Sequence, residues 1–205
     1  MPHIFIHGLR QQPSSWEQML SQMEAPIQAL CPSLSETVGS KEVTYTNLYN
    51  SFVEYLNEFP EPVDICGLSL GGTLALNYAI DNPGRVNSLV LVGARAKVPK
   101  SLKQKIHLKL LPKGIFKGMA FQKKDMVNLS ISLMGMDLSQ GLKTIECPTL
   151  VLCGENDFPF KDASIFIAER IPGAELVFIE NAEHQVNKDN PEQMAIEVDK
   201  FYKSL

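Results

Sequence analysis

A serine stands between two glycines in the segment GLSLG, residues 67–71. This G-x-S-x-G pattern follows a short apolar run and precedes a helical segment, which is the setting of a nucleophile elbow. In such a turn the serine backbone is strained and its hydroxyl is raised above the edge of the sheet. The following helix directs its positive N-terminus toward the turn, which favours a developing anion. The pattern predicts Ser69 as a nucleophile; the alternative is a glycine-rich turn with an incidental serine.

A serine hydroxyl becomes a good nucleophile only when a base removes its proton. The chain has four histidines. His184 follows the last predicted strand, and chemistry in parallel α/β sheets gathers at the carboxyl ends of the strands. We therefore predict His184 as the base and His7, after the first strand, as a residue that shapes a loop. His3 is expected to be structural and His107 to be exposed.

The base in turn needs a carboxylate that holds its tautomer and stabilises its charged form. Asp157 lies just beyond a predicted strand, in the segment LVLCGENDFPF. Glu155 is the nearby alternative, and Asp162 is expected to be the N-cap of the following helix. The chain order Ser69, Asp157, His184 is the order expected when the serine lies on an elbow of this type.

Attack on a carbonyl carbon also requires N–H donors for the oxyanion. The backbone N–H of Leu70, directly after the serine, is the first candidate. Leu9, in the loop after the first strand, is the second. Arg10 follows in the same loop and is a candidate ligand for a substrate carboxylate; the alternative is an arginine that faces solvent.

Short apolar runs alternate with amphipathic segments along the chain. Most runs are continuous, as in strands that are covered on both faces. Strands are expected at 4–6, 63–68, 86–93, 149–154 and 175–180, with a weaker sixth at 27–34. Helices are expected at 14–23, opened by a capping box of Ser14 and Glu17, and at 48–59, 70–80, 162–171 and 191–202. This alternation predicts one α/β domain over residues 1–205, with a compact, mostly parallel sheet of about six strands wrapped by helices.

The stretch 96–143 interrupts this alternation, because it contains no predicted strand. We expect it to form a helical cap inserted into the domain. Met126, Leu129 and Leu133 are expected to face inward, which makes Met126 a candidate substrate-binding residue. The stretch is rich in lysine, which predicts a solvated face of the cap; contact with anionic lipid or an acidic substrate is the alternative.

Composition excludes several classes of function. The 205 residues are 44% hydrophobic and 20% charged with a net charge of −4, so the chain has no basic excess that would indicate nucleic-acid binding. No apolar run approaches the length of a membrane span, and the start of the sequence does not resemble a signal peptide. The four cysteines form no CxxC pair, so we expect buried free thiols in the reducing cytoplasm.

Several segments of the sequence, taken together, resemble the α/β-hydrolase family. The resemblance is carried by FIHGLRQQPSSW, ALCPSL, DICGLSLGGTLALNYAIDNPGRVNSLVLVGAR, CPTLVLCGEND and IENAEHQVNKDNPEQ. It implies a central parallel sheet and a cap after the strand that ends at Gly93. The chain departs from the family by lacking its first two strands, and CPSLSETVGS replaces a glycine-rich loop. Ala182 and Glu183 precede His184, where glycine often stands two residues before the histidine.

The sequence thus predicts a serine hydrolase that cleaves a carboxylic ester or thioester of a small to medium acyl group. This mechanism requires no metal and no organic cofactor, and its partner is a small-molecule acyl substrate. The alternatives are peptide cleavage, carbon–carbon bond hydrolysis, acyl transfer, or a ligand receptor on the same scaffold with slow or no turnover. Nothing in the sequence indicates an oligomeric state.

Overall fold

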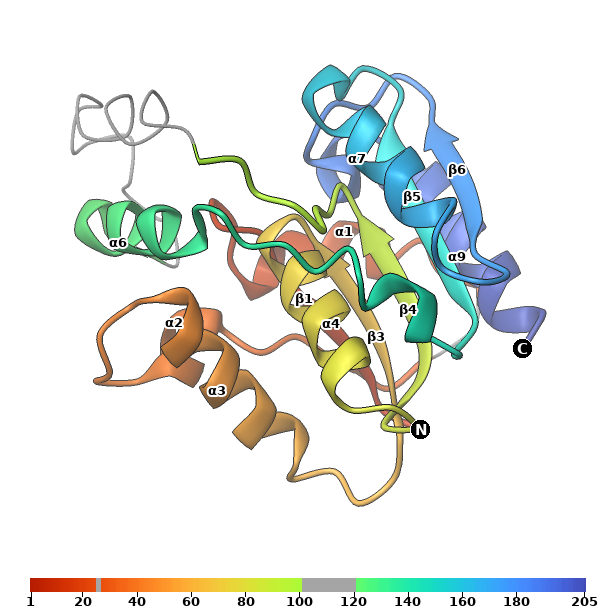
Figure 1. The fold of residues 1–205 in the computed structure, drawn as a ribbon. Coiled ribbons are helices and arrows are strands. Elements are labelled where there is room, and N and C mark those ends of the chain that lie inside the picture. Colours follow the sequence, from red (N-terminus) through yellow and green to blue (C-terminus); the bar gives the residue numbers. More distant parts are fainter. Residues whose placement is uncertain (25–26, 101–120) are drawn as a thin grey trace.

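Six parallel strands form one sheet in a computed structural model of the chain, which describes residues 1–24, 27–100 and 121–205 (Figure 1). The strand order is β2-β1-β3-β4-β5-β6, and each neighbouring pair is parallel. The strands are β1 (His3–Ile6), β2 (Ala29–Leu30), β3 (Val63–Leu68), β4 (Val86–Val92), β5 (Thr149–Gly154) and β6 (Glu175–Ile179). The predicted α/β fold with about six strands is confirmed.

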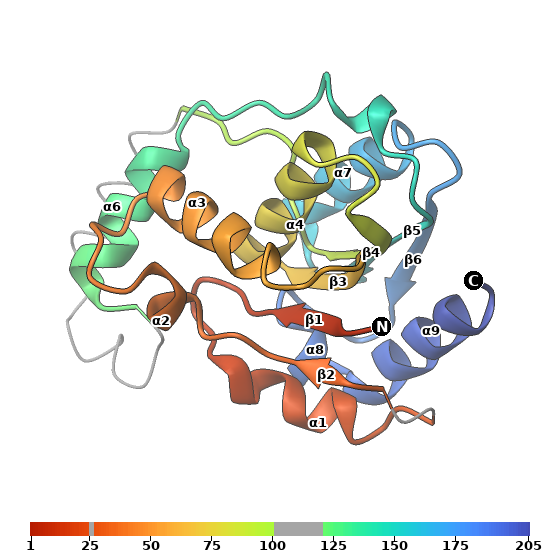
Figure 2. The same ribbon diagram turned by 90° about the horizontal axis from the view of Figure 1, so that it is seen from below.

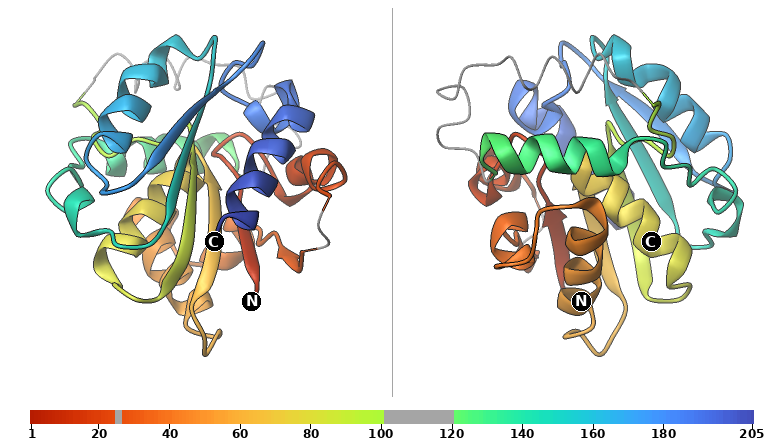
Figure 3. Two further views of the ribbon diagram at one scale, coloured as in Figure 1. Left: turned by 90° about the vertical axis from the view of Figure 1, so that its right-hand side faces the viewer. Right: turned by 60° about the vertical axis from the view of Figure 1, so that its left-hand side comes forward.

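Helices cover both faces of this sheet (Figure 2, Figure 3). One face is covered by α3 (Tyr45–Leu56), α4 (Leu70–Asp81) and α7 (Phe158–Ala168). The other face is covered by α1 (Glu17–Leu20), α8 (Val186–Asp189) and α9 (Pro191–Lys203). The shorter elements that complete the described chain are η1 (Pro13–Trp16), α2 (Leu34–Val38), α6 (Lys123–Leu133) and η3 (Leu142–Thr144).

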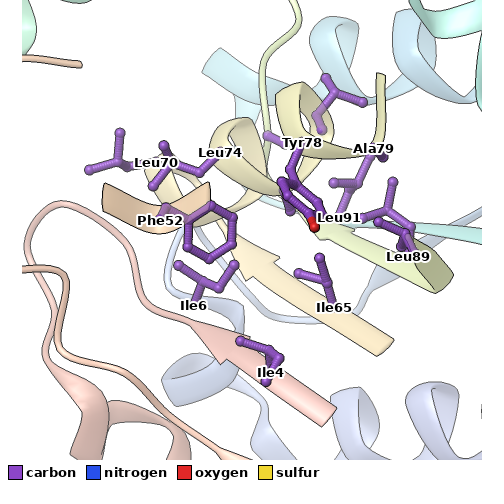
Figure 4. Close-up of a cluster of buried hydrophobic side chains, with 14 of the residues drawn as sticks. Ile4, Ile6, Phe52, Ile65, Leu70, Leu74, Tyr78, Ala79, Leu89 and Leu91 are labelled. Atoms are coloured by element: carbon purple, nitrogen blue, oxygen red, sulfur yellow. The ribbon is translucent and has the colours of Figure 1, made fainter. Parts of the chain in front are cut away.

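Each face of the sheet has its own apolar cluster, because successive strand residues point to opposite faces. Ile4 and Ile6 of β1 pack with Phe52 of α3 and with Leu74 and Tyr78 of α4 (Figure 4). The intervening Phe5 of β1 packs on the opposite face, with its ring edge-on to that of Trp16. Strands covered on both faces explain why the apolar runs in the sequence are continuous.

Three local predictions need correction. The weaker strand expected at 27–34 is present but is only two residues long, as β2, and Leu34 already begins α2. At η1 the reciprocal side-chain and backbone bonds of a capping box join Gln12 and Ser15, not Ser14 and Glu17. Proline at position 13 starts a 3-10 turn, and its fixed φ suits the first turn of a helix. The expected helix over 14–23 is therefore split into η1 and a single α-helical turn.

The helix after β5 also begins earlier than predicted. It starts at Phe158 with Asp157 in the N-cap position, so Asp162 lies within α7 and is not a cap. Proline in the first turn explains this early start, since its φ is already helical and its missing N–H is not needed there. The consequence is that Asp157 lies at the junction of strand end and helix start.

The connection between β4 and β5 spans the predicted cap. Its described part contains α6, which packs against α3, and η3. The side-chain hydroxyl of Ser132 in α6 accepts a hydrogen bond from the N–H of Tyr45 at 2.7 Å, which ties α6 to the start of α3. Residues 101–120, which include the predicted exposed His107, lie outside the described residues. No helix in the described ranges is long and apolar enough to cross a membrane.

The strand order reverses direction at β1. The chain passes from β1 to β2 on one side and then to β3 on the other. The connections after β1 and β3 therefore leave toward opposite faces of the sheet, α1 lying on one and α4 on the other. In open α/β sheets the crevice at such a switch point, outside the carboxyl ends of the strands, is where ligands bind. Gly8 and Ser69 follow these two strands.

Candidate active site

Ser69 is the first residue after β3 and has a φ of +55°, a conformation that few residues other than glycine adopt. The turn is tight because Gly71 lies against the end of β1. A Cβ atom at Gly71 would collide with the backbone carbonyl of Ile6, and one at Gly67 would collide with the backbone of Gly71. Both glycines of the G-x-S-x-G pattern are thus required by close backbone approach, and the turn exposes the Ser69 hydroxyl.

A continuous chain of hydrogen bonds joins three side chains at this edge of the sheet. The Oδ2 atom of Asp157 lies 2.6 Å from Nδ1 of His184, and Nε2 of His184 lies 2.8 Å from Oγ of Ser69. An ionised carboxylate only accepts hydrogen bonds, so Nδ1 of His184 must donate to Asp157. In neutral His184 this leaves Nε2 as the acceptor for the Ser69 hydroxyl. The arrangement has the geometry that removes a proton from a serine.

Two neighbouring loops hold the histidine and its carboxylate. Asp157 follows β5 and His184 follows β6, and these strands are paired. The N–H of Glu155 donates to the carbonyl of Ile179 and that of Asn156 donates to the carbonyl of Ala182, both at 2.8 Å. Asp157 is 3% exposed. Backbone bonds between the loops therefore fix the two side chains before any substrate arrives.

The structure separates the alternative acids and bases from this arrangement. The carboxylate of Glu155 is exposed and accepts a hydrogen bond from the N–H of Asn181. His3 lies 3.4 Å from Asp64, a pair formed at the N-terminal side of the sheet. His7 is fully buried, with Nδ1 2.9 Å from the carbonyl of Gly8, and it shapes the loop after β1 as predicted.

The two candidate oxyanion donors flank Ser69. Leu70 is the first residue of α4, and its N–H is among those that a helix leaves without an intrahelical partner. Leu9 belongs to the loop after β1 and lines the cavities described below together with Ser69. That loop is tied down by Gln11, whose Nε2 donates to Oδ1 of Asn187 at 2.8 Å. Since Asn187 lies in α8, directly after the His184 loop, the two loops are held together.

Two cavities meet at Ser69. The smaller has a volume of about 200 Å³, and the larger, of about 410 Å³, also contains His184. Leu9, Ser69 and Phe160 line both of them. The site therefore offers two separate spaces that both reach Ser69.

The remaining predicted binding residues differ in position. Arg10 is exposed and lines the larger cavity. Met126 is 1% exposed and lies in the core cluster of the α4 face, and it is not among the described residues that line either cavity. From the same helix, α6, Ser130 and Leu133 line the smaller cavity.

Sequence reasoning missed Phe160 and Arg95. The ring of Phe160, in α7, stacks on His184 with centroids 4.0 Å apart, and the guanidinium carbon of Arg95 lies 4.0 Å from the centre of the Phe160 ring. Burial lowers the pKa of Arg95, while the nearby Asp157 raises it. Arg95 is the third residue after β4, in the segment LVGAR, so the rule that selected His184, position after a strand end, was the available signal.

The four cysteines are free and do not compete with Ser69 as nucleophiles. Burial raises the pKa of Cys31 to about 11, with the charge of Glu17 as a second cause. Burial also raises the pKa values of Cys66, Cys147 and Cys153. Since the thiolate is the reactive form, these thiols are poor nucleophiles near neutral pH.

Comparison with known proteins gives a consistent result for the fold. The sequence model of the alpha/beta hydrolase family matches residues 4–197. MenH from S. aureus is 18% identical, with a TM-score of 0.80 over 100% of this chain and 94% of that one. A thermophilic esterase from Thermogutta terrifontis is 16% identical, with a TM-score of 0.79 over 100% of this chain and 90% of that one.

An enol-lactonase from Burkholderia xenovorans LB400 is also 16% identical, with a TM-score of 0.81 over 98% of this chain and 91% of that one. At these identities the likeness concerns the fold alone. No curated protein sequence matches the chain.

Proposed function

Because the chain belongs to the alpha/beta hydrolase family, we propose that it is a serine hydrolase that cleaves a carboxylic ester or thioester of a small to medium acyl group. The observation that carries the proposal is the continuous hydrogen-bonded series Asp157–His184–Ser69. The series lies beside two cavities, at a sheet edge where ligands bind in this class of fold. An esterase and an enol-lactonase among the structural neighbours agree with ester chemistry.

In the first step the Ser69 oxygen attacks the acyl carbon while His184 accepts the hydroxyl proton at Nε2. The carbonyl oxygen gains negative charge and is stabilised by the N–H groups of Leu9 and Leu70. The bond to the leaving group then breaks, and His184 gives its proton to the departing alcohol or thiol. Asp157 stabilises the imidazolium that forms between these two proton transfers.

In the second step water attacks the acyl carbon of the ester formed on Ser69. His184 takes a proton from the water and returns it to the Ser69 oxygen as the acyl–enzyme bond breaks. The products are a carboxylic acid and the free enzyme. All groups in this cycle are supplied by the chain and by water, so the cycle has no step that calls for a cofactor.

We further propose that residues 96–143 form a cap over this site within one domain. Support comes from Ser130 and Leu133 of α6, which line the smaller cavity with Ser69. Such a cap excludes water from the acyl group and limits its size. The four free cysteines support a reducing compartment, the cytoplasm, as the location.

Hydrolysis of a panel of p-nitrophenyl esters and acyl thioesters by the purified protein tests the proposal, with Ser69→Ala as control. We expect turnover of short and medium acyl groups that is lost in Ser69→Ala. Turnover that survives in this variant would contradict the role of the serine. Absence of turnover across the panel, with a folded protein, would favour the receptor alternative or one of the other reactions of such sites: peptide cleavage, carbon–carbon bond hydrolysis or acyl transfer.

A further inference from the structure

The two cavities at Ser69 differ in their access to His184. On the proposed function, on which this inference rests, His184 gives its proton to the leaving group, so the leaving group must lie in the cavity that contains His184. That is the larger one. The acyl group therefore occupies the smaller cavity, of about 200 Å³, between α4, α6 and the segment after β4. This volume is below the roughly 300–1,000 Å³ of most ligand pockets and suits a short acyl chain.

The acyl cavity contains a single charged side chain among its described lining residues, Arg95. The hydroxyl-bearing residues Thr73 and Ser130 line it as well, and most of the rest is apolar. An apolar pocket with a few converging polar groups orients a ligand by those groups. The charge of Arg95 is thus the strongest feature by which this cavity distinguishes one acyl group from another.

No acidic side chain in the described part of the chain lies within ion-pair distance of the Arg95 guanidinium. The remaining residues, 25–26 and 101–120, cannot supply an acidic side chain either, because neither segment contains Asp or Glu. The carboxylate of Asp157 raises the pKa of Arg95 by its charge, but it already accepts a hydrogen bond from His184. The positive charge beside the acyl cavity therefore forms no ion pair with a described residue, and Asp157 acts on it only from a distance.

The guanidinium is also held in position with donors to spare. It stacks on Phe160, and its Nη2 donates to the carbonyl of Pro159 at 2.7 Å. Its Nη1 atom donates to none of the described residues, whereas its Nε atom is buried and lies out of reach of a ligand in the cavity. A carboxylate in the cavity is a suitable partner for this guanidinium, because its two oxygens match the planar fork of arginine.

We propose that Arg95 is a specificity residue that binds a carboxylate at the far end of the acyl group. The preferred substrates are then monoesters or monothioesters of short dicarboxylic acids. The leaving group departs on the His184 side, and the free carboxylate of the acyl group meets Arg95, Thr73 and Ser130. The competing role for Arg95 is purely structural: it would only hold Phe160 against His184. Loss of Arg95 would then lower the activity on all substrates alike.

Matched substrates separate the two roles. Phenyl monoesters of succinic, glutaric and adipic acid are compared with the esters in which the free carboxylate is replaced by a carboxamide of the same shape. After subtraction of spontaneous hydrolysis, we expect the wild-type kcat/KM for at least one carboxylate ester to exceed that of its carboxamide by about 10-fold or more. Equal or lower values for all three carboxylate esters would overturn the proposal, and this comparison requires no variant.

In Arg95→Gln the carboxylate-to-carboxamide ratio of kcat/KM should fall by about 10- to 100-fold, since a hydrogen-bonded ion pair is lost. Arg95→Lys should retain part of the preference, because the charge remains. Lys97→Gln is the matched control; Lys97 is a nearby exposed cation that pairs with Asp137 and does not line this cavity, so the ratio should stay at the wild-type value. A fall of both rates by the same factor in Arg95→Gln would overturn the specificity role.

Calorimetric titration of glutarate into Ser69→Ala, with and without Arg95→Gln, distinguishes failure of this inference from failure of the proposed function. Binding that depends on Arg95 supports the carboxylate site even if no ester is turned over, in which case only the proposed function fails. Hydrolysis that depends on Ser69 but ignores the carboxylate leaves the proposed function intact and removes the role of Arg95.

Discussion

The carboxylate of Asp157 and the imidazole of His184 meet at 2.6 Å, although the two residues are 27 positions apart in the chain. The contact exists because β5 and β6 are adjacent and end at the same edge of the sheet. Asp157 is buried, so its carboxylate is shielded from water and the hydrogen bond fixes which nitrogen of His184 carries the proton.

Asp157→Asn should reduce turnover about 10³- to 10⁴-fold with the fold preserved, because an amide can hold His184 in the wrong tautomer. Steady-state kinetics on the best ester of the panel, with circular dichroism for the fold, checks this. Glu155→Gln is the matched control and should stay close to wild type, since among the described residues the Glu155 carboxylate bonds only to the backbone N–H of Asn181. The reverse ranking of the two variants would show that the acid is misassigned.

Ser69→Ala and His184→Ala should each lower turnover about 10⁴-fold or more, and the double variant should lose little beyond that. The reason is that the two side chains act as one unit through their 2.8 Å hydrogen bond, because His184 can act as a base only when the Ser69 hydroxyl is there to be deprotonated. Kinetics of the two single variants and the double variant completes the cycle. Losses that multiply in the double variant would mean that the residues act independently.

Much of this site could be predicted from sequence, because its parts depend on local pattern and strand order. G-x-S-x-G between strand and helix identifies Ser69, and the ends of later strands identify Asp157 and His184. The failures depend on tertiary contacts. The run 27–34 is apolar enough for a strand, yet only Ala29 and Leu30 reach β1 before the chain turns into α2.

Arg95 and Phe160 could not be ranked from sequence for a different reason. Phe160 reaches His184 only because α7 begins at Phe158, and the sequence pattern predicted a later start. The role proposed for Arg95 depends on its forming no ion pair with a described residue, and this can be known only once the folded structure brings the side chains together. Met126 has the helical spacing of an inward residue, but the interior it meets is the core, whereas Leu133 meets the cavity.

Leu133→Trp should narrow the acyl cavity and shift the preference toward shorter acyl groups. In the wild type each methylene that fits should add about 0.8 kcal/mol of binding until the space of about 200 Å³ is full. The variant should therefore lose more kcat/KM on octanoyl than on acetyl p-nitrophenyl ester. An unchanged profile across acetyl, butyryl and octanoyl esters would exclude Leu133 from the acyl site, and a palmitoyl optimum in the wild type would contradict the small cavity.

Stability should fall in mild acid because of His7. Its Nε2 accepts a hydrogen bond from the N–H of Leu34 at 3.1 Å and its Nδ1 faces the carbonyl of Gly8, so the neutral ring satisfies both contacts. Burial lowers the pKa of His7 from its ordinary value of 6.5. The unfolded chain then binds the proton first, so this contribution is fully present above pH 6.5 and is lost as the pH falls below it.

Urea unfolding at about pH 7.5 and about pH 5.5 measures this loss. The His7 share is at most about 1.4 kcal/mol at the lower pH, one unit below the ordinary pKa. His7→Gln should show a smaller drop in unfolding free energy than the wild type. His3→Gln measures the share of His3 in the same drop of unfolding free energy, because burial lowers the pKa of His3 as well. An equal drop in wild type and His7→Gln would refute the assignment to His7.

The most direct test of the central claim is reaction with a fluorophosphonate probe followed by peptide mass spectrometry. Only a serine activated by a base attacks such a probe at a useful rate, so substrate identity does not enter the measurement. We predict a single adduct on Ser69, no adduct in Ser69→Ala, and much slower labelling in His184→Ala. An unlabelled Ser69 in folded protein, or an adduct on another residue, would contradict the assignment of Ser69 as the activated nucleophile.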